Sequence, residues 1–427
     1  MLDHESDWRW RGLGEGFKIY VRNEERCVEC GFCVECFSCP GMGKPTMFRE
    51  PERCVGCGVC YVACPYEAVE EALDEGGRGF VKITVQGEVY EVPERITIAK
   101  ALELLGLKSS PVPGEGLLSI PCGTGGCFSC SVYVDGELLP ACTTPVRDGI
   151  AIEVPEAGER LLRRVSGFQP HPVGGVGTPW WLKGKGRYIE VACFAHGCNL
   201  RCPQCQNFSV TYDNIAKPRR PEEAARMLTA LRRYYRVDRM AISGGEPTLN
   251  RPWLMAFFKS LRELNKDPRA RFHLDTNATV LTPDYIDELV LEAGITDIGP
   301  DVKGLRLETF MCITGIADKQ LARLYLKREW EAVKYILDNY YPERVFMGIG
   351  VPYNPAFMSL EELREIGERI ASMDPDVQVC VLDYFPTFRR RDIERPSFEQ
   401  MTEARGVLVE AGLRTVIAQT EYGHVGP

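Results

Sequence analysis

Cysteine offers the most chemistry in this sequence, because 19 of its 427 residues are cysteines and only 5 are histidines. The cysteines gather in three groups, within residues 27–64, 122–142 and 198–205. Closely spaced thiolates bind soft metals, whereas disulfide scaffolds belong to short secreted chains. The pattern therefore predicts thiolate-held metal centres in a reducing compartment, which favours the cytoplasm.

The first group contains a repeat, ERCVECGFC at 25–33 and ERCVGCGVC at 52–60, and ends in Cys64-Pro65. The resulting C-x2-C-x2-C-x3-C-P run is that of bacterial ferredoxins, in which the fourth thiolate reaches the other [4Fe-4S] cluster. A module this small depends on its metal for folding. Pseudo-symmetry assigns the ligands as one cluster on Cys27, Cys30, Cys33 and Cys64, and another on Cys54, Cys57, Cys60 and Cys39. Cys36 can replace Cys39, and a pair of structural zinc knuckles is the alternative.

The second group has C-x4-C-x2-C spacing with a further cysteine beyond, which is the plant-type [2Fe-2S] pattern. Its ligands would be Cys122, Cys127, Cys130 and Cys142. We expect two strands within FVKITVQGEVYEV, a helix in TIAKALELLGL and a hairpin turning at Asp135-Gly136. The segment PCGTGGCFSCSVYVDGELLPACTTPV resembles the β-grasp [2Fe-2S] domains at the front of hydrogenases, respiratory dehydrogenases and molybdenum hydroxylases. Zinc is again the alternative.

The third group is Cys198, Cys202 and Cys205, spaced C-x3-C-x2-C after a predicted strand. Three thiolates leave one iron of a four-iron cube without a protein ligand, and an open coordination position distinguishes a catalytic metal site from a structural one. Half of a zinc ribbon is the alternative interpretation.

From about residue 188, apolar runs alternate with helical patterns such as PEEAARMLTALRRYY and SLEELREIGERIAS. This alternation predicts an α/β domain with a parallel sheet, open or curled into a barrel. In barrels the chemistry sits at the carboxyl ends of the strands. Polar motifs follow three predicted strands there: SGGEP at 243–247, DTNA at 275–278 and DVK at 301–303.

The order GCNLRCPQCQN, SGGEPTL, DTNA, DVKG, GVPYNP and LDYFPTF is similar to the pyruvate formate-lyase activating enzymes, which are radical S-adenosylmethionine (SAM) proteins. The resemblance implies a partial (β/α)6 barrel and SAM bound at the open iron of the third cluster. Reduction would then split SAM into methionine and a 5'-deoxyadenosyl radical. The cofactor contacts implied are Gly244, Gly245, Glu246, Asp275, Asn277, Asp301 and Lys303. Gln204 stands where the family carries an aromatic residue near adenine.

The predicted organisation is a two-cluster ferredoxin-like module at 1–78, a β-grasp [2Fe-2S] domain at 79–155, a Gly- and Pro-containing linker at 156–187 and a radical SAM domain at 188–427. SAM cleavage needs a strongly reducing electron. We therefore expect the front clusters to relay electrons from an external ferredoxin- or flavodoxin-like donor.

Three functions compete for this chain. It could activate a glycyl radical enzyme, it could be a radical SAM enzyme for a small metabolite, peptide or lipid, or it could be a non-enzymatic electron-transfer subunit. The net charge of -9 argues against a broad nucleic-acid surface, and the basic runs at 217–220 and 389–391 are expected to be solvated loops. The start predicts no signal peptide, and no apolar run is long enough to span a membrane. Cys193 and Cys380 are expected in core strands, and Cys312 has no assigned role.

Overall fold

A computed structural model describes residues 16–40, 51–74, 76–183 and 187–427. The predictions for the first 15 residues, for 41–50 and for the end of the linker at 184–186 lie outside the described residues. The chain divides into two compact units. The first comprises residues 1–165, 195–199 and 207–219, and the second comprises 166–194, 200–206 and 220–427. Within the described ranges, no helix combines the length and apolar character needed to cross a membrane.

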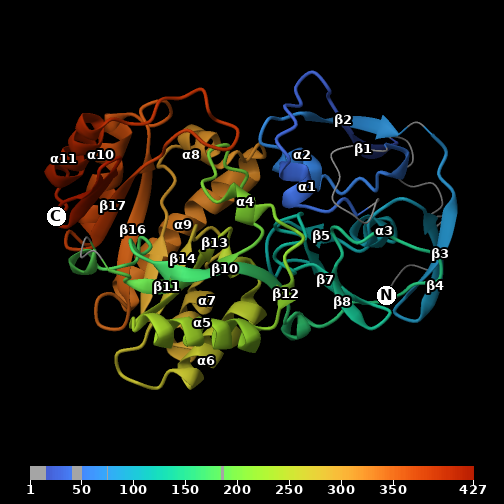
Figure 1. The fold of residues 1–427 in the computed structure, drawn as a ribbon, viewed down its shortest axis with the longest axis horizontal. Helices are drawn as coiled ribbons and strands as arrows, with labels where there is room; N and C mark the ends of the chain where they lie inside the picture. Colours follow the sequence, from blue (N-terminus) through green and yellow to red (C-terminus); the bar gives the residue numbers. More distant parts are fainter. Residues whose placement is uncertain (1–15, 41–50, 75, 184–186) are drawn as a thin grey trace. The chain divides into compact units, whose positions relative to one another are not determined.

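The first unit begins with a small two-stranded module, drawn in blue in Figure 1. Its strands β1 (Phe17–Arg22) and β2 (Val69–Asp74) pair antiparallel along their whole length. Each cysteine run leads into a short helix, α1 (Phe32–Glu35) or α2 (Val59–Ala63), entered through a left-handed glycine, Gly31 or Gly58. The two halves therefore have the matching local structure that the sequence repeat predicts.

The rest of the first unit is built on a five-stranded mixed sheet with the order β4-β3-β9-β7-β8. The predicted elements are present as β3 (Phe80–Val85), β4 (Glu88–Pro93), α3 (Ile98–Leu104), β7 (Ser131–Val134), β8 (Glu137–Pro140) and β9 (Ala151–Glu153). The hairpin turns at Asp135 and Gly136, both with positive φ as such a turn requires. Helix α3 packs its apolar face into one core with these strands. The short pair β5 (Ser109–Ser110) and β6 (Leu118–Ser119) stands beside this sheet.

The second unit is an α/β domain in which six consecutive strands run parallel, β13 to β18. Their bounds are β13 (Arg239–Gly244), β14 (Arg271–Thr276), β15 (Asp297–Pro300), β16 (Phe346–Tyr353), β17 (Gln378–Asp383) and β18 (Val416–Thr420). Strand β11 (Glu190–Ala195) lies beside β13, and β19 (Gly423–Val425) closes the other edge antiparallel. Apolar side chains bury both faces of these strands, as the sequence pattern predicts.

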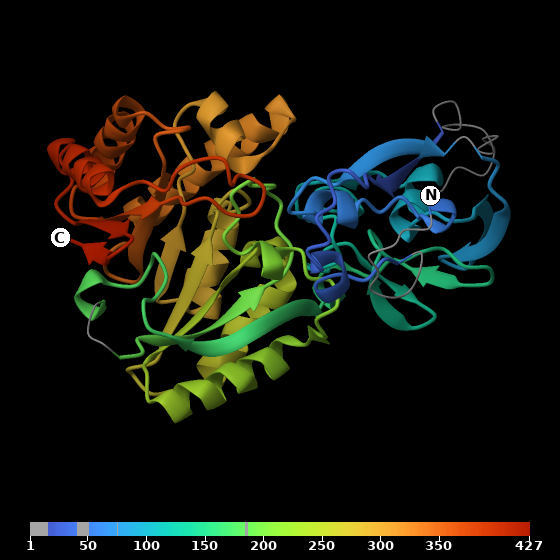
Figure 2. The same cartoon turned by 45° about the horizontal axis from the view of Figure 1, so that its top comes forward.

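Helices connect the parallel strands and lie along the outer side of the curved sheet (Figures 1 and 2). They are α5 (Pro221–Tyr235), α6 (Arg251–Leu264), α7 (Pro283–Asp287), which continues as a π-helix (Glu288–Ala293), α8 (Leu307–Thr314), α9 (Lys319–Asn339), α10 (Leu360–Met373) and α11 (Phe398–Glu410). The short helix α4 (Phe208–Thr211) belongs to the first unit. Ser359 caps α10 by accepting from the Glu362 amide, as predicted. Thr282 stands at the predicted start of α7, but its hydroxyl bonds to Asp284 instead of capping a backbone amide.

The segment predicted as a linker, 156–187, contains a nine-residue strand that the prediction missed. Strand β10 (Arg163–His171) crosses the segment, and its first residues pair with β12 (Pro218–Arg219) inside the first unit. The strand was missed because Gly167 and Pro170 interrupt its alternation, whereas sheet pairing satisfies its backbone. The basic run at 217–220 therefore contains a paired strand rather than a fully solvated loop.

Candidate functional site

The two-cluster module gathers its thiols into a cradle at the first cysteine run. Cys27, Cys30 and Cys33 line one small cavity together with Cys64, as the sequence assignment required, and Cys60 and Pro65 also reach it. The wall is largely apolar, because Val28, Phe32 and Phe37 complete it. A thiol-lined, mostly apolar cavity suits a soft iron–sulfur cluster, so the residues present fit the cluster predicted there.

The second thiol set of this module is held around Cys57. Burial raises the pKa of the Cys57 thiol, and the neighbouring thiols of Cys60, Cys39 and Cys54 raise it further. Cys36 has different neighbours: burial, Asp213 and Glu35 raise its pKa to about 11, and the Cys30 thiol contributes to the same shift. The effect of Cys39 on Cys57 supports the prediction that Cys39 belongs to the Cys54–Cys60 set.

The [2Fe-2S] candidate site has the most deeply buried thiols of the first unit. Cys122, Cys127 and Cys130 are fully buried and Cys142 is nearly so. Contacts with the thiols of Cys127 and Cys142 lower the pKa of Cys122, which is the expected result where thiols from a loop and a following segment converge. Gly123 and Gly125 have positive φ, which lets the loop curl around the sulfurs. The donor set fits a [2Fe-2S] cluster.

The third group of cysteines follows β11, and two of its members belong to the second unit. The Cys205 amide donates to the Cys202 carbonyl (3.1 Å), which makes a tight turn between them. Burial raises the pKa of the Cys202 thiol, and the Lys303 ammonium and a contact with Tyr384 partly offset this. A cation beside the sulfur favours the thiolate that a cluster needs.

Gln204, at the position where an aromatic residue was expected, is fully buried between backbone and an arginine. Its amide donates to the Tyr384 carbonyl (3.0 Å), and its oxygen accepts from Arg390 (3.4 Å). The amides of Arg389 and Arg390 both donate to the Pro203 carbonyl. The basic run at 389–391 therefore holds the cysteine loop in place, so the prediction of a merely solvated loop was wrong.

The GGEP motif ends β13, and its carboxylate ties two strand ends together. Gly244 has φ of 112°, a conformation that glycine adopts without strain. Glu246 is fully buried and accepts from the Thr248 amide and hydroxyl, from the Thr276 hydroxyl (2.7 Å) and from the Asn277 amide (2.6 Å). Both of its oxygens are engaged, so Glu246 positions the DTNA segment at the end of β14.

The DTNA and DVK motifs are joined in the same way. The Asp301 amide donates to the Thr276 carbonyl (3.0 Å), and the Asp301 carboxylate pairs with the Lys303 ammonium (2.9 Å). Burial alone would lower the pKa of Lys303, but Asp301 and the Cys202 thiol raise it above its ordinary value. Asn277 uses its side-chain oxygen for the Thr279 amide and hydroxyl. Hydrogen bonds and charges thus connect the three motifs and Cys202 in one continuous network at the carboxyl ends of the strands.

A residue that sequence reasoning missed completes this network. Glu329 of α9 is fully buried, and its carboxylate accepts from the Lys303 amide (3.2 Å). Burial raises the pKa of Glu329 well above its ordinary value, although Lys303 lowers it. The signal that could have found Glu329 is a charged residue next to Trp330 on the apolar face of a helix.

Three protein families match parts of the chain that contain cysteines of each group. Residues 193–356 match the Radical SAM superfamily, residues 79–156 match the 2Fe-2S iron–sulfur cluster binding domain, and residues 48–70 match the 4Fe-4S binding domain. The chain carries a radical SAM domain. The predicted radical SAM domain is therefore confirmed, together with the two types of iron–sulfur domain in front of it.

Individual relatives cover parts of the chain. An uncharacterized iron–sulfur protein of Methanocaldococcus jannaschii is 37% identical over 19% of this chain and 18% of its own length. A provisionally named glycyl-radical enzyme activating enzyme of the same organism is 25% identical over 42% of this chain and 68% of its own length. A 7-carboxy-7-deazaguanine synthase of Hyperthermus butylicus is 27% identical, over 42% of this chain and 74% of its own. The chain thus spans less than a fifth of the first relative.

Among solved structures, native anSMEcpe with bound AdoMet is similar at 15% identity and a TM-score of 0.35. The similarity covers 52% of this chain and 60% of that one.

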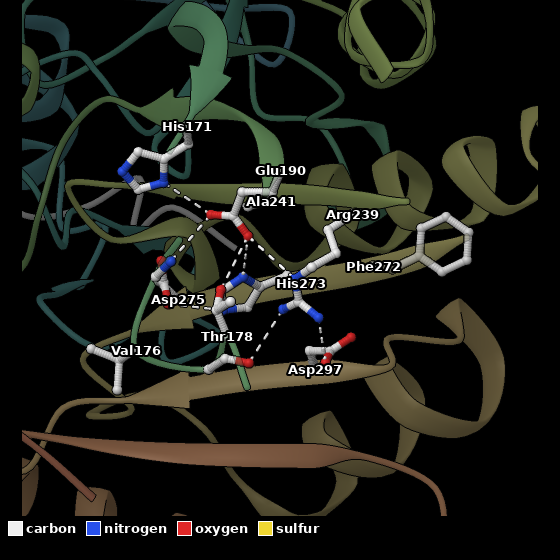
Figure 3. Close-up of polar contacts among 12 residues, drawn as sticks. His171, Val176, Thr178, Glu190, Arg239, Ala241, Phe272, His273, Asp275 and Asp297 are labelled. Atoms are coloured by element: carbon white, nitrogen blue, oxygen red, sulfur yellow. Dashed lines mark hydrogen bonds and ion pairs between the residues drawn. The ribbon is translucent and has the colours of Figure 1, made fainter. Parts of the chain in front are cut away.

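The radical SAM domain also contains a buried charged network that the sequence did not predict (Figure 3). Glu190, the first residue of β11, accepts from His171 (3.0 Å), His273 (3.1 Å) and the Thr178 hydroxyl (3.2 Å), and lies 3.5 Å from Arg239. Arg239 continues to Asp297 (2.8 Å), and His273 continues to Asp275 (3.0 Å). Asp275, a predicted SAM contact, is therefore paired with His273 of the same strand.

This network anchors a segment that fills the amino ends of the strands, Val173–Lys183, which we call the floor segment. Glu190 accepts from the Gly175 amide, Arg239 donates to the Gly177 carbonyl, and Gln378 binds the carbonyls of Val176 and Thr178. A Cβ on Gly177 would lie 2.5 Å from the Ile298 backbone, and one on Gly299 would lie 2.6 Å from the Gly177 amide. Glycines on both sides thus allow backbone to pack on backbone.

His273 gives this part of the radical SAM domain a defined pH dependence. Burial alone would lower its pKa, but Asp275 and Glu190 raise it from 6.5 to about 9. A group whose pKa is higher in the folded state contributes its full stability below its unfolded pKa and loses it as the pH rises through the folded pKa. We therefore expect thermal stability to fall between about pH 6.5 and pH 9, by an amount on the order of a few kcal/mol.

The measurement is the anaerobic unfolding temperature across that pH range for the native chain and for His273→Gln. Glutamine has no charge to lose, so the variant should be less stable at pH 6.5 but show a flatter profile. Parallel profiles would show that His273 is not the titrating group.

Proposed function

We propose that this chain reductively cleaves SAM at a [4Fe-4S] cluster held by Cys198, Cys202 and Cys205, and that the radical produced abstracts hydrogen from a glycyl radical enzyme. The observation that carries the proposal is the continuous network from Glu246 through Thr276 and Asp301 to Lys303 and Cys202. When bound, the cluster would supply the electron that splits the sulfonium and an open iron for the amino and carboxylate groups of SAM.

The residues of the chain would have distinct roles around that centre. Gly244 and Gly245 would present backbone to the methionine end of SAM, and Lys303 would offset negative charge beside Cys202. Asp275 would face the methionine or ribose, oriented by His273. Glu246 and Asn277 would hold the strand ends at their spacing, since their side chains are already engaged within the protein. The curved sheet would then be a partial (β/α)6 barrel.

The front of the chain would hold the remaining clusters, in a ferredoxin-like module ending near residue 78 and a β-grasp domain ending near 155. The first unit supports the assignment of Cys27, Cys30, Cys33 and Cys64 to one [4Fe-4S] cluster. Cys54, Cys57, Cys60 and Cys39 would hold the other, and Cys122, Cys127, Cys130 and Cys142 the [2Fe-2S] cluster. With the SAM cluster, this loading corresponds to about 14 iron atoms per chain. The physiological electron source would be a cytoplasmic ferredoxin- or flavodoxin-like protein.

The direct test measures 5'-deoxyadenosine from SAM under anaerobic conditions with dithionite. We expect turnover by the native chain, and a glycyl radical signal when a matched glycyl radical enzyme is added. If the protein carried all of its clusters and formed no 5'-deoxyadenosine, the proposal would be wrong and a role as an electron-transfer subunit would be favoured.

A second candidate substrate is a small molecule, because one relative is a 7-carboxy-7-deazaguanine synthase. In that case, 5'-deoxyadenosine formation should rise with a small-molecule substrate, and no glycyl radical should accumulate on a partner protein. The two outcomes separate the two substrate classes without changing the proposed cleavage step.

Removing one of the front clusters distinguishes an electron-relay role of the two-cluster module from a structural role. In Cys57→Ala, SAM cleavage driven by a protein donor is expected to slow several-fold, whereas cleavage driven by dithionite should be unchanged, because a small reductant can reach the SAM cluster directly. Equal loss with both reductants would instead assign a structural role to this module.

A further inference from the structure

The residue that precedes the first SAM-cluster ligand lies directly against the [2Fe-2S] loop, within the first unit. A Cβ on Gly197 would stand 3.1 Å from the Cys122 sulfur and 2.9 Å from the Cys127 amide. A Cβ on Gly126 would stand 2.6 Å from the Gly197 amide. Two cluster-binding loops are therefore in backbone contact at Gly197, the residue directly before Cys198.

Hydrogen bonds fix this contact from both sides through two arginines at the start of β10. The Arg164 amide donates to the Gly126 carbonyl (3.1 Å), and the Arg164 carbonyl accepts from the His196 amide (3.1 Å). The Arg164 side chain also binds the Gly125 carbonyl (3.2 Å), and the fully buried Arg163 binds the His196 carbonyl (3.2 Å). The first two residues of β10 thus connect Gly126 with His196 through hydrogen bonds.

The other end of the SAM-cluster loop meets the two-cluster module less directly. Asn214 donates to the Cys36 carbonyl (3.1 Å) and accepts from the Ser38 amide (2.8 Å), and Phe208 packs on Phe32. Asn214 is nine residues beyond Cys205, and Cys36 is not among the proposed ligands. The contact that lies nearest along the chain to a proposed SAM-cluster ligand is therefore the one through Gly197, which directly precedes Cys198.

We propose that the [2Fe-2S] centre is the immediate electron donor to the SAM cluster, and that the electron is transferred where Gly126 contacts Gly197. This inference rests on the proposed function. One electron from the external donor, a low-potential ferredoxin- or flavodoxin-type protein, would pass through the front [4Fe-4S] clusters to the [2Fe-2S] centre and leave the donor oxidised by one electron. Its onward transfer would reoxidise the [2Fe-2S] centre and supply the electron that splits one carbon–sulfur bond of SAM into methionine and a 5'-deoxyadenosyl radical. Because tunnelling falls steeply with distance, close contact between the loops is what the crossing requires.

The first test measures the magnetic interaction between the [2Fe-2S] centre and the SAM cluster, and it needs no enzymatic turnover. In the fully loaded native chain reduced with dithionite, the electron paramagnetic resonance signal of the [2Fe-2S] centre should relax faster when the SAM cluster is also reduced. The effect should disappear in Cys202→Ala, which identifies the SAM cluster as the partner. It should weaken several-fold in Gly126→Ala, because the added methyl group meets backbone that cannot turn aside.

Gly158→Ala is the matched control, since nothing lies within 4 Å of its Cβ position and neither glycine has positive φ. Its relaxation should equal that of the native chain. If reduction of the SAM cluster did not change the relaxation rate of the [2Fe-2S] signal in the native chain, the inference would be overturned.

The second test removes a ligand of the [2Fe-2S] cluster. In Cys142→Ser, rapid freezing after mixing with a reduced protein donor should show the two front [4Fe-4S] clusters reduced and reduction of the SAM cluster slowed several-fold. Direct reduction by dithionite should still give its signal. Reduction at the native rate would overturn the inference while leaving SAM cleavage intact. Absence of 5'-deoxyadenosine from the native chain with dithionite would instead overturn the proposed function, so the two failures are distinguishable.

Discussion

Cys202→Ala is expected to abolish 5'-deoxyadenosine formation from SAM completely, with a protein donor and with dithionite alike. Two remaining thiolates do not hold a four-iron cube, so iron content should fall by about four atoms per chain while the [2Fe-2S] spectrum persists. Iron analysis, electron paramagnetic resonance and product chromatography on one anaerobic preparation measure all three quantities.

Cys312→Ala is the matched control for that variant, because Cys312 is an exposed thiol of α8 that belongs to none of the three cysteine groups. It should retain native iron and native turnover. If Cys202→Ala kept its full iron load and still produced 5'-deoxyadenosine, the third group would not be the catalytic cluster.

Glu190→Ala is expected to destabilise the radical SAM domain by about 3–5 kcal/mol, the cost of leaving buried charges without their partner. The charges concerned are the guanidinium of Arg239 and the ring of His273, both buried beside the Glu190 carboxylate. The same change releases the Gly175 amide and the Thr178 hydroxyl of the floor segment. Anaerobic thermal unfolding followed by circular dichroism measures the effect.

Two variants bracket this result. Glu292→Ala removes a surface carboxylate whose pair with Lys259 is half exposed, so its effect should stay below about 1 kcal/mol. Glu190→Gln keeps the shape and some hydrogen bonds but loses the charge, and should fall between the two. Equal unfolding temperatures for Glu190→Ala and Glu292→Ala would mean that the buried network adds no stability.

The sequence predicted those parts of the structure that depend on local pattern. The strands from β13 to β18 lie where apolar runs indicated, and the hairpin turns at Asp135-Gly136. The spacing of the cysteines located all three groups of thiols. These features could be predicted because ligand spacing, turn residues and strand–helix periodicity each depend on a few neighbouring residues.

Features that depend on distant partners could not be predicted in the same way. Glu190 and His273 are 83 residues apart, and either alone looks like an ordinary polar residue in a strand. The floor segment has no periodicity, because its conformation is set by glycines at 299 and 348 and by side chains at the first positions of four strands, Glu190, Arg239, Asp297 and Gln378. Spacing alone also permits either Cys39 or Cys36 as the fourth ligand of the second [4Fe-4S] cluster, because that position depends on the fold.

The floor segment affects how small molecules can enter and leave the radical SAM domain. Backbone occupies the space between the first residues of the strands, so we expect small molecules to approach the polar motifs from the opposite, carboxyl side of the sheet. Under the proposed function, methionine and 5'-deoxyadenosine would then leave from the same side that admits the next SAM. A macromolecular substrate bound on that side would delay their release, so its dissociation would limit the rate of repeated turnover.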